Sequence, residues 1–163
     1  MRGTAVAAVL AATTLAVLAM PASAGTTQIS GTGAFDDCVP PPSAGAPTNP
    51  PNFYPPIKMA GDLVGCWYTN VPARSKFNPS GTYQEKGTEL FVGCMGEACG
   101  TFSTTYTFTG KYVDDTFAEE IHGRCQHPIV SGTGDFVGAK GVVLFKDDVV
   151  NLEFNYRGHI SLG

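Results

Sequence analysis

An alternation of aromatic and hydroxyl side chains limits the folds open to this chain more than any other feature of its sequence. The segment GTFSTTYTFTGKY spans residues 100–112, and serine or threonine fills most of the positions between its aromatic residues. The aromatic residues on one face of this extended segment are Phe102, Tyr106, Phe108 and Tyr112. A period of two residues over this length predicts a half-buried antiparallel strand rather than a helix.

The sequence after residue 56 continues in extended segments separated by turn residues. Strands are predicted over residues 62–70, 82–93, 116–124, 141–146 and 151–160. The chain has 20 glycines among 163 residues, and those between Ser131 and Gly141 suit a strongly bent antiparallel sheet. We therefore expect an all-β fold of one domain, in which a meander closes into a barrel and so removes exposed strand edges.

The first residues have the pattern of a secretory signal peptide. A positive start at Arg2 precedes an apolar run from Thr4 to Met20, and Ala-Ser-Ala then ends at Ala24. This pattern predicts a signal peptide over residues 1–24, cleaved after Ala24, and a secreted, extracellular protein. No second apolar run follows, so we expect no membrane contact after cleavage.

A proline-rich segment precedes the predicted strands. Residues 39–56 carry eight prolines, which fix the backbone and remove hydrogen-bond donors. We expect residues 25–56 to form an N-terminal arm and an extended linker, and residues 57–163 to form the barrel domain.

Charge and motifs exclude several functions. The formal net charge is −4 and no run of lysine or arginine occurs, so no nucleic-acid partner is expected. The glycines of residues 132–138 lack the spacing of a dinucleotide-binding loop, and no nucleophile elbow is present. We expect no cofactor, and the sequence sets no oligomeric state.

Five cysteines in a secreted chain predict disulfide bonds with one cysteine left over. Cys94 and Cys99 lie between two predicted strands, which favours a bond between them. Cys66 and Cys125 lie in apolar strands, and we expect them to form the second pair, leaving Cys38 unpaired. The pairs Cys38–Cys66 and Cys38–Cys125 remain open, because the sequence does not fix the connectivity.

The spacing His122-x-x-Cys125-x-His127 brings together residue types that bind zinc. Side chains at 122 and 125 point to opposite faces of a regular strand, and a cysteine in a secreted protein is normally oxidised. We therefore expect no metal site here.

Residues 131–148, SGTGDFVGAKGVVLFKDD, resemble the GTG-x-F…A-x-G signature shared by plant dirigent proteins and the allene oxide cyclase barrel superfamily. The segments GTELF, TTYTFTGKY, GRCQHPIVSGTGDF and YRGHI are similar to the exported bacterial branch, the allene oxide cyclase barrel-like proteins. The resemblance covers residues 63–163 and implies a single antiparallel eight-stranded barrel of lipocalin-like shape. Its members include a cyclase, coupling-directing proteins and polyketide cyclases, and none of their catalytic residues is carried over to this chain.

Such a barrel has room for its own side chains or for one small ligand. Aromatic side chains at strand spacing are the candidates to line it, or alternatively to fill it as a core. The candidate ligand-binding residues are Trp67, Phe91, Phe102, Tyr106, Phe108, Phe117 and Phe154, with Phe136 and Phe145 in similar positions.

Carboxylates on the same strand faces supply the candidates for catalysis. Glu85 and Glu89 share the parity of an aromatic face, and Glu119 shares that of Phe117. Burial would raise the pKa of such a group and make it a general acid or base. The candidate catalytic residues are Glu89, Glu119 and Tyr106; the alternative places the carboxylates at the barrel mouth or in ion pairs.

Two functions are consistent with the predicted barrel, its aromatic lining and its carboxylates. The first is a secreted barrel that binds a small apolar or aromatic molecule, or that acts as an extracellular module without turnover. The alternative is an isomerase or cyclase that acts on a polyene or oxidised lipid. An open cavity containing a polar group favours the enzyme, whereas a barrel plugged by aromatic side chains favours the module.

Overall fold

Nine β-strands form most of the part of the chain that the computed structural model describes, residues 25–70 and 72–163. The predicted signal peptide lies outside these residues. The strands are β1 (Thr26–Phe35), β2 (Ile57–Gly61), β3 (Leu63–Thr69), β4 (Arg74–Asn78), β5 (Thr82–Met95), β6 (Ala98–Tyr112), β7 (Glu120–Gly134), β8 (Lys140–Asp148) and β9 (Glu153–Ser161). A short 3₁₀ helix, η1 (Pro42–Ala44), lies between β1 and β2.

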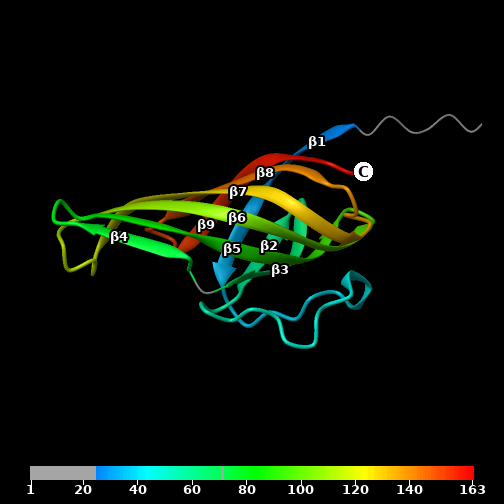
Figure 1. The fold of residues 1–163 in the computed structure, drawn as a ribbon, viewed down its shortest axis with the longest axis horizontal. Helices are drawn as coiled ribbons and strands as arrows, with labels where there is room; N and C mark the ends of the chain where they lie inside the picture. The colour runs from blue at the N-terminus through cyan, green and yellow to red at the C-terminus, as the bar shows by residue number, and fades with distance from the viewer. Residues whose placement is uncertain (1–24, 71) are drawn as a thin grey trace, which may run out of the picture.

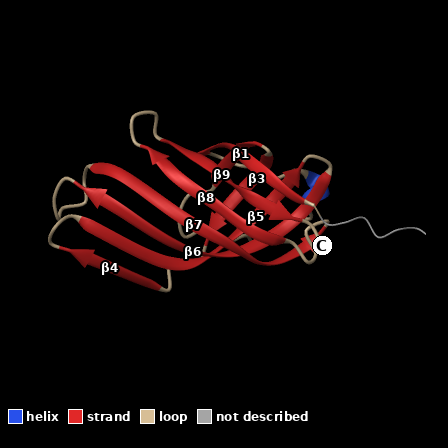
Figure 2. Cartoon of the chain, turned by 90° about the horizontal axis from the view of Figure 1, so that it is seen from above, coloured by secondary structure: helices blue, strands red, loops and turns tan. Residues whose placement is uncertain are grey.

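Eight of these strands close into an antiparallel barrel. The sheet order is β3-β2-β1-β9-β8-β7-β6-β5-β4, and a further pairing between β3 and β5 closes the ring. Strand β4 pairs only with β5 and lies outside the ring, at the opposite end of the molecule from the C-terminus (Figures 1 and 2). The structure confirms the predicted all-β, eight-stranded barrel, whose closure leaves β4 as the exposed edge.

The N-terminal residues predicted to form an arm are a strand of the barrel. Strand β1 lies between β2 and β9 and pairs with both. Gly31 permits this, because a Cβ there would lie 2.1 Å from the carbonyl oxygen of Ala60. The barrel therefore begins at Thr26, not at the boundary predicted near Ile57.

The strand predicted over residues 116–124 is wrong at its start. Residues 113–119 form a loop, and β7 begins at Glu120. The side chain of Asp114 accepts a hydrogen bond from the backbone N–H of Thr116 at 2.9 Å, which folds the chain into a turn. Phe117 follows in the left-handed region with φ 56°.

The proline-rich segment between β1 and β2 packs against the outside of the barrel. Ala44 of η1 is 2% exposed and belongs to a small core on the outer face of β3 and β5. The buried members of this outer core are Ala44, Cys66, Tyr68 and Val92. The segment is thus held on the barrel wall, whereas the sequence predicted an extended linker.

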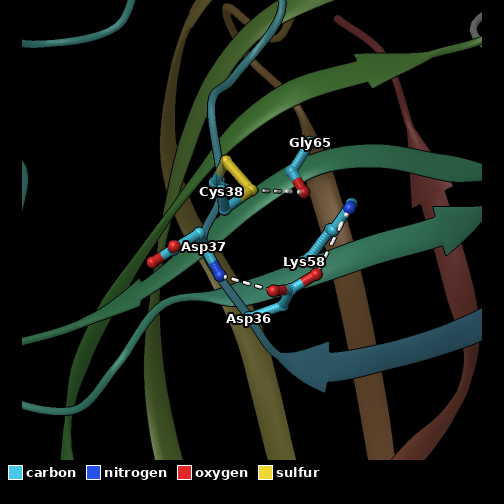
Figure 3. A network of polar contacts seen from close by, with 6 residues as sticks. Asp36, Asp37, Cys38, Lys58 and Gly65 are labelled. Carbon is cyan, nitrogen blue, oxygen red and sulfur yellow. Dashed lines mark hydrogen bonds and ion pairs between the residues drawn. A yellow bond between two sulfur atoms is a disulfide. The ribbon is translucent and has the colours of Figure 1, made fainter.

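A disulfide bond and an ion pair attach this segment to the barrel (Figure 3). Cys38 is bonded to Cys66 of β3, and the Nζ of Lys58 on β2 lies 3.3 Å from Oδ2 of Asp36. The Sγ of Cys38 also lies 3.4 Å from the carbonyl oxygen of Gly65. An oxidised sulfur has no proton to donate, so this is a packing contact.

The predicted pair Cys66–Cys125 is wrong, and Cys94–Cys99 is confirmed. Cys94 and Cys99 are register partners where β5 turns into β6, and Cys125 is buried as a free thiol. Cys66 lies in the outer core, whereas Cys125 packs in the inner core of the barrel. Two side chains on opposite faces of the wall cannot reach each other, because side chains alternate along a strand.

Aromatic side chains fill the half of the barrel that lies away from β4. Five side chains have no exposed area and come from four strands of the ring and the loop between β7 and β8: Leu63, Phe91, Phe102, Phe136 and Ile160. The ring centroids of Phe91 and Phe102 lie 4.7 Å apart, and those of Phe102 and Phe136 lie 5.3 Å apart. This half of the interior is a solid core.

The two disulfide bonds should differ in how much they stabilise the fold. We expect Cys38→Ala/Cys66→Ala to lower the free energy of unfolding by about 3–4 kcal/mol, because the bonded residues are 28 apart in sequence. Cys94 and Cys99 are 5 apart, and the matched double alanine variant should lose about 2 kcal/mol. Urea unfolding followed by tryptophan fluorescence measures both, and a larger loss for the second variant would contradict the prediction.

Candidate ligand-binding cavity

A cavity of about 270 Å³ occupies the other half of the barrel interior. The cavity lies at the end of the barrel next to β4. The loop 113–119 and both ends of the loop 36–56 lie at the same end. The apolar part of the lining is supplied by Phe35, Ile57, Phe108, Phe145 and Phe154. No lysine or arginine lines it, whereas four carboxyl groups do: Glu85, Glu89, Glu120 and Asp147.

Glu85 of β5 is buried and accepts hydrogen bonds from three tyrosine hydroxyls. The distances are 2.9 Å from Tyr54 and 2.6 Å from Tyr106, and Tyr83 makes the third contact. Burial, together with the hydrogen bond to Glu85 and its negative charge, raises the pKa of Tyr54 to about 12 and those of Tyr83 and Tyr106 still further. The three phenols therefore stay neutral and act as donors.

Glu89, the next inward-facing carboxyl group on β5, accepts hydrogen bonds from Trp67 and Thr69. Its Oε2 lies 2.8 Å from Trp67 Nε1, and its Oε1 lies 3.1 Å from Thr69 Oγ1. His127 Nε2 lies 3.0 Å from the same Oε2, and His127 Nδ1 lies 3.1 Å from the carbonyl oxygen of Val143.

The partners of His127 define where its protons are. The Val143 carbonyl oxygen can only accept, so Nδ1 of His127 carries a proton. The contact between Nε2 and Glu89 then also needs one proton, which sits on either the imidazole or the carboxyl group. His127 and Glu89 are both buried, so they form a proton-sharing pair beside the aromatic core.

Glu120 and Asp147 form a second acidic pair, at the start of β7 and the end of β8. Gly123 lies between them: a Cβ there would come within 2.4 Å of Glu120 Oε1 and 2.0 Å of Asp147 Oδ2. Burial and the neighbouring carboxyl group raise the pKa of Glu120 to about 8, and burial raises that of Asp147. Glu120 is therefore protonated at neutral pH and shares its proton with Asp147 in a side-chain hydrogen bond.

The free thiol of Cys125 also lines the cavity, two residues before His127 on β7. Burial, with a further contribution from the charge of Glu89, raises its pKa. Cys125 is therefore a neutral thiol under ordinary conditions and is poorly suited to act as a nucleophile.

Several of the residues predicted from the sequence meet in this cavity. Tyr106, Phe108, Phe154 and Glu89 all line it. Trp67 is 1% exposed and reaches the site through its hydrogen bond to Glu89.

Other predicted residues lie elsewhere. Phe91 and Phe102 belong to the solid core. Phe117 packs in the loop after β6, with its ring 4.8 Å from that of Phe77 and 6.1 Å from that of Tyr83. Glu119 is exposed in the same loop, because the strand that would have turned it inward begins one residue later.

The sequence reading did not single out Tyr54, Glu120 or Asp147. Tyr54 lies among prolines, so it was read as part of the linker. Asp147 follows the strand predicted over residues 141–146, but β8 continues through Asp148. Glu120 shares the face of Cys125 because of an irregularity in the pairing of β6 with β7, which the sequence does not reveal.

Comparison with protein-family models, with curated proteins and with solved structures finds no match to this chain. Within the described residues, no group of three or more His, Cys, Asp or Glu side chains is arranged to hold a metal ion. The described part of the chain also contains no helix of the length and apolar character needed to span a membrane.

The acidic pair should make stability depend on pH. Folding raises the pKa of Glu120 from 4.5 to about 8, so the folded state holds a proton that the unfolded state has lost between these values. The free energy of unfolding should therefore fall as the pH rises from about 5 to 8, and the fall should be smaller in Glu120→Gln. Thermal unfolding across this range measures the difference.

The neighbouring exposed carboxyl group provides a matched control. Glu119→Gln removes the same charge one residue away, and its pH profile should follow that of the unmodified protein. Parallel profiles for Glu120→Gln and the unmodified protein would contradict the shared proton.

Proposed function

We propose that this chain is an exported barrel protein that binds one small organic molecule in the cavity beside β4. The observation that carries the proposal is the composition of the cavity, in which apolar walls surround a few fixed polar groups. This is the usual composition of a small-molecule site, and a volume of about 270 Å³ suits a small ligand. The N-terminal sequence and the two disulfide bonds support an oxidising, extracellular location.

The hydrogen-bonding state of the carboxyl groups indicates what polar group the ligand carries. Glu85 and Glu89 already accept hydrogen bonds from tyrosine, tryptophan and threonine side chains. Glu120 is bonded only to the carboxyl group of Asp147, and its buried Oε1 receives no hydrogen bond from a hydroxyl or N–H group. A ligand hydroxyl or amine near Glu120 would satisfy this acceptor, while its apolar body contacts Phe108, Phe145 and Phe154.

The resemblance of residues 131–148 to the allene oxide cyclase barrel signature supports the same proposal. Barrels of eight strands enclose space for one small ligand, and here the aromatic core leaves only one half available. We include membership of that superfamily in the proposal.

An isomerase or cyclase is the second candidate, and the Glu89–His127 pair favours it. This pair shares a proton at the inner limit of the cavity, and three neutral phenols lie nearby on Glu85. Groups that exchange protons beside an enclosed apolar space can serve as a general acid and base. The cavity walls would confine a polyene or oxidised lipid in a reactive conformation.

Binding can be measured with 2-naphthol, which has an aromatic body and one hydroxyl donor. We expect the purified protein to bind 2-naphthol more tightly than 2-methoxynaphthalene, which has no donor. We also expect Cys125→Phe to abolish binding, because the new ring fills part of the cavity. Naphthol fluorescence titration provides the affinities, and native mass spectrometry of protein from its culture medium identifies the natural ligand.

Two control variants make this result specific. Cys125→Ala enlarges the cavity and should retain binding, whereas Glu120→Gln should reduce the preference for naphthol over its methyl ether. Equal affinity of the Cys125→Phe variant for 2-naphthol would place the binding site outside the cavity and contradict the proposal.

Turnover distinguishes the second candidate from the first. If the protein is an enzyme, small molecules extracted from its culture medium should be converted by the unmodified protein, and the rate should fall at least a hundredfold in Glu89→Gln. Glu119→Gln, whose side chain is exposed, should retain full activity. Liquid chromatography with mass spectrometry follows the conversion, and identical extracts after all three incubations would exclude the enzyme for these compounds.

A further inference from the structure

The outer surface of the barrel carries a band of basic residues that the strand register brings together. One row across the sheet is Arg74, Lys86, Thr107, Gln126, Leu144 and Arg157, each residue paired with the next on the neighbouring strand. The adjacent row is Lys76, Gln84, Thr109, Arg124, Lys146 and Asn155. We call the basic members of these two rows the basic band: Arg74, Lys76, Lys86, Arg124, Lys146 and Arg157.

The two rows that contain the basic band include no acidic side chain. All of its basic residues are exposed, and in the described part of the chain none of them forms an ion pair. The next row on the outer surface, two residues closer to the cavity end of the barrel, contains His122 on β7. In the same row Asp148 of β8 is paired with Glu153 of β9. The carboxyl groups Glu85 and Asp147 lie on the inner face of the same strands.

Two contacts within the band are unfavourable for the free protein. Arg74 is the direct partner of Lys86, and Arg124 is the direct partner of Lys146. Like charges placed directly opposite each other on adjacent antiparallel strands destabilise the sheet. The stability of the sheet therefore does not explain why these basic residues lie side by side. Binding of an anionic partner would remove the repulsion between them.

A hollow in the surface lies within the band. Its charged and polar lining residues are Arg124, Gln126, Lys146, Asn155 and Arg157, and the lining also contains Cys125, Leu144, Phe145 and Tyr156. Its volume is about 490 Å³. Three cationic side chains and two amide side chains in the lining of one hollow offer both charge and hydrogen bonds to one partner.

We propose that the basic band binds an acidic polysaccharide. The spacing of the rows supports a linear polyanion: neighbouring strands lie about 4.8 Å apart, so the band extends roughly 24 Å around the barrel from β4 to β9. Threonine, glutamine and asparagine side chains alternate with the charges and donate to and accept from sugar hydroxyl groups. This site lies outside the barrel wall and does not depend on a ligand in the cavity.

The composition of the band argues against two other anionic partners. The one apolar member of the two rows, Leu144, is only partly exposed, and exposed large apolar side chains such as Phe35 and Leu152 are not members of the rows, so the band offers little apolar surface to insert into a lipid surface. Its two rows also contain no aromatic residue on which single-stranded bases could stack.

The test uses heparin, a sulfated polysaccharide, and polygalacturonate, a carboxylated one. Isothermal titration should show that the unmodified protein binds at low salt and that binding weakens as salt increases. We expect Arg124→Gln/Lys146→Gln to bind both polymers at least about tenfold more weakly and with a shallower salt dependence, because two cations of the band are lost. Thermal unfolding of this variant should be unchanged or shifted upward, because a repulsive pair is removed.

A variant with the same change of charge outside the band controls for net charge. Lys58→Gln/Lys140→Gln removes two exposed cations from β2 and the start of β8, and it should bind the polymers like the unmodified protein. Equal binding by the two double variants would overturn the proposal. Tighter binding of the unmodified protein to phosphatidylglycerol vesicles or to DNA than to either polysaccharide would also overturn it.

Discussion

Closure of the ring through β1 determines the rest of this structure. Strand β1 pairs with both β2 and β9, and without it the sheet would be open between these two strands. Closure gives every strand of the ring one inner and one outer face. Because side chains alternate along a strand, successive residues lie either inside the barrel or on its outer surface. Gly31 makes this possible, because the backbone of β2 approaches too closely for any larger residue.

The inner environment divides along the barrel axis. One half is filled by aromatic and aliphatic side chains such as Phe91 and Phe102, and the other half contains carboxyl groups. Burying charge without partners is unfavourable, and each carboxyl group is accommodated in a different way. Glu85 accepts from three phenols, Glu89 is paired with His127, and Glu120 shares a proton with Asp147. These arrangements hold polar groups in fixed positions beside an apolar surface, which a ligand site requires.

One part of the outer surface has the opposite charge. Basic residues that are far apart in sequence form one band, while four carboxyl groups of the same strands, Glu85, Glu89, Glu120 and Asp147, line the cavity inside. The proline-rich segment covers a different part of the wall, over β3 and β5, where Cys38 and Cys66 hold it. It leaves the band uncovered and also supplies Tyr54 to the cavity.

The sequence by itself determined the all-β barrel and the Cys94–Cys99 bond, because both depend on local features: alternation within a strand and a short hairpin. It also placed Glu89 and Tyr106 on inward faces. Only the tertiary structure decided the Cys38–Cys66 bond, the exclusion of Glu119 and the inclusion of Glu120. These depend on which strands are neighbours, on where a loop ends and on an irregular register. Such properties are set by packing between distant segments, as is the gathering of scattered basic residues into one band.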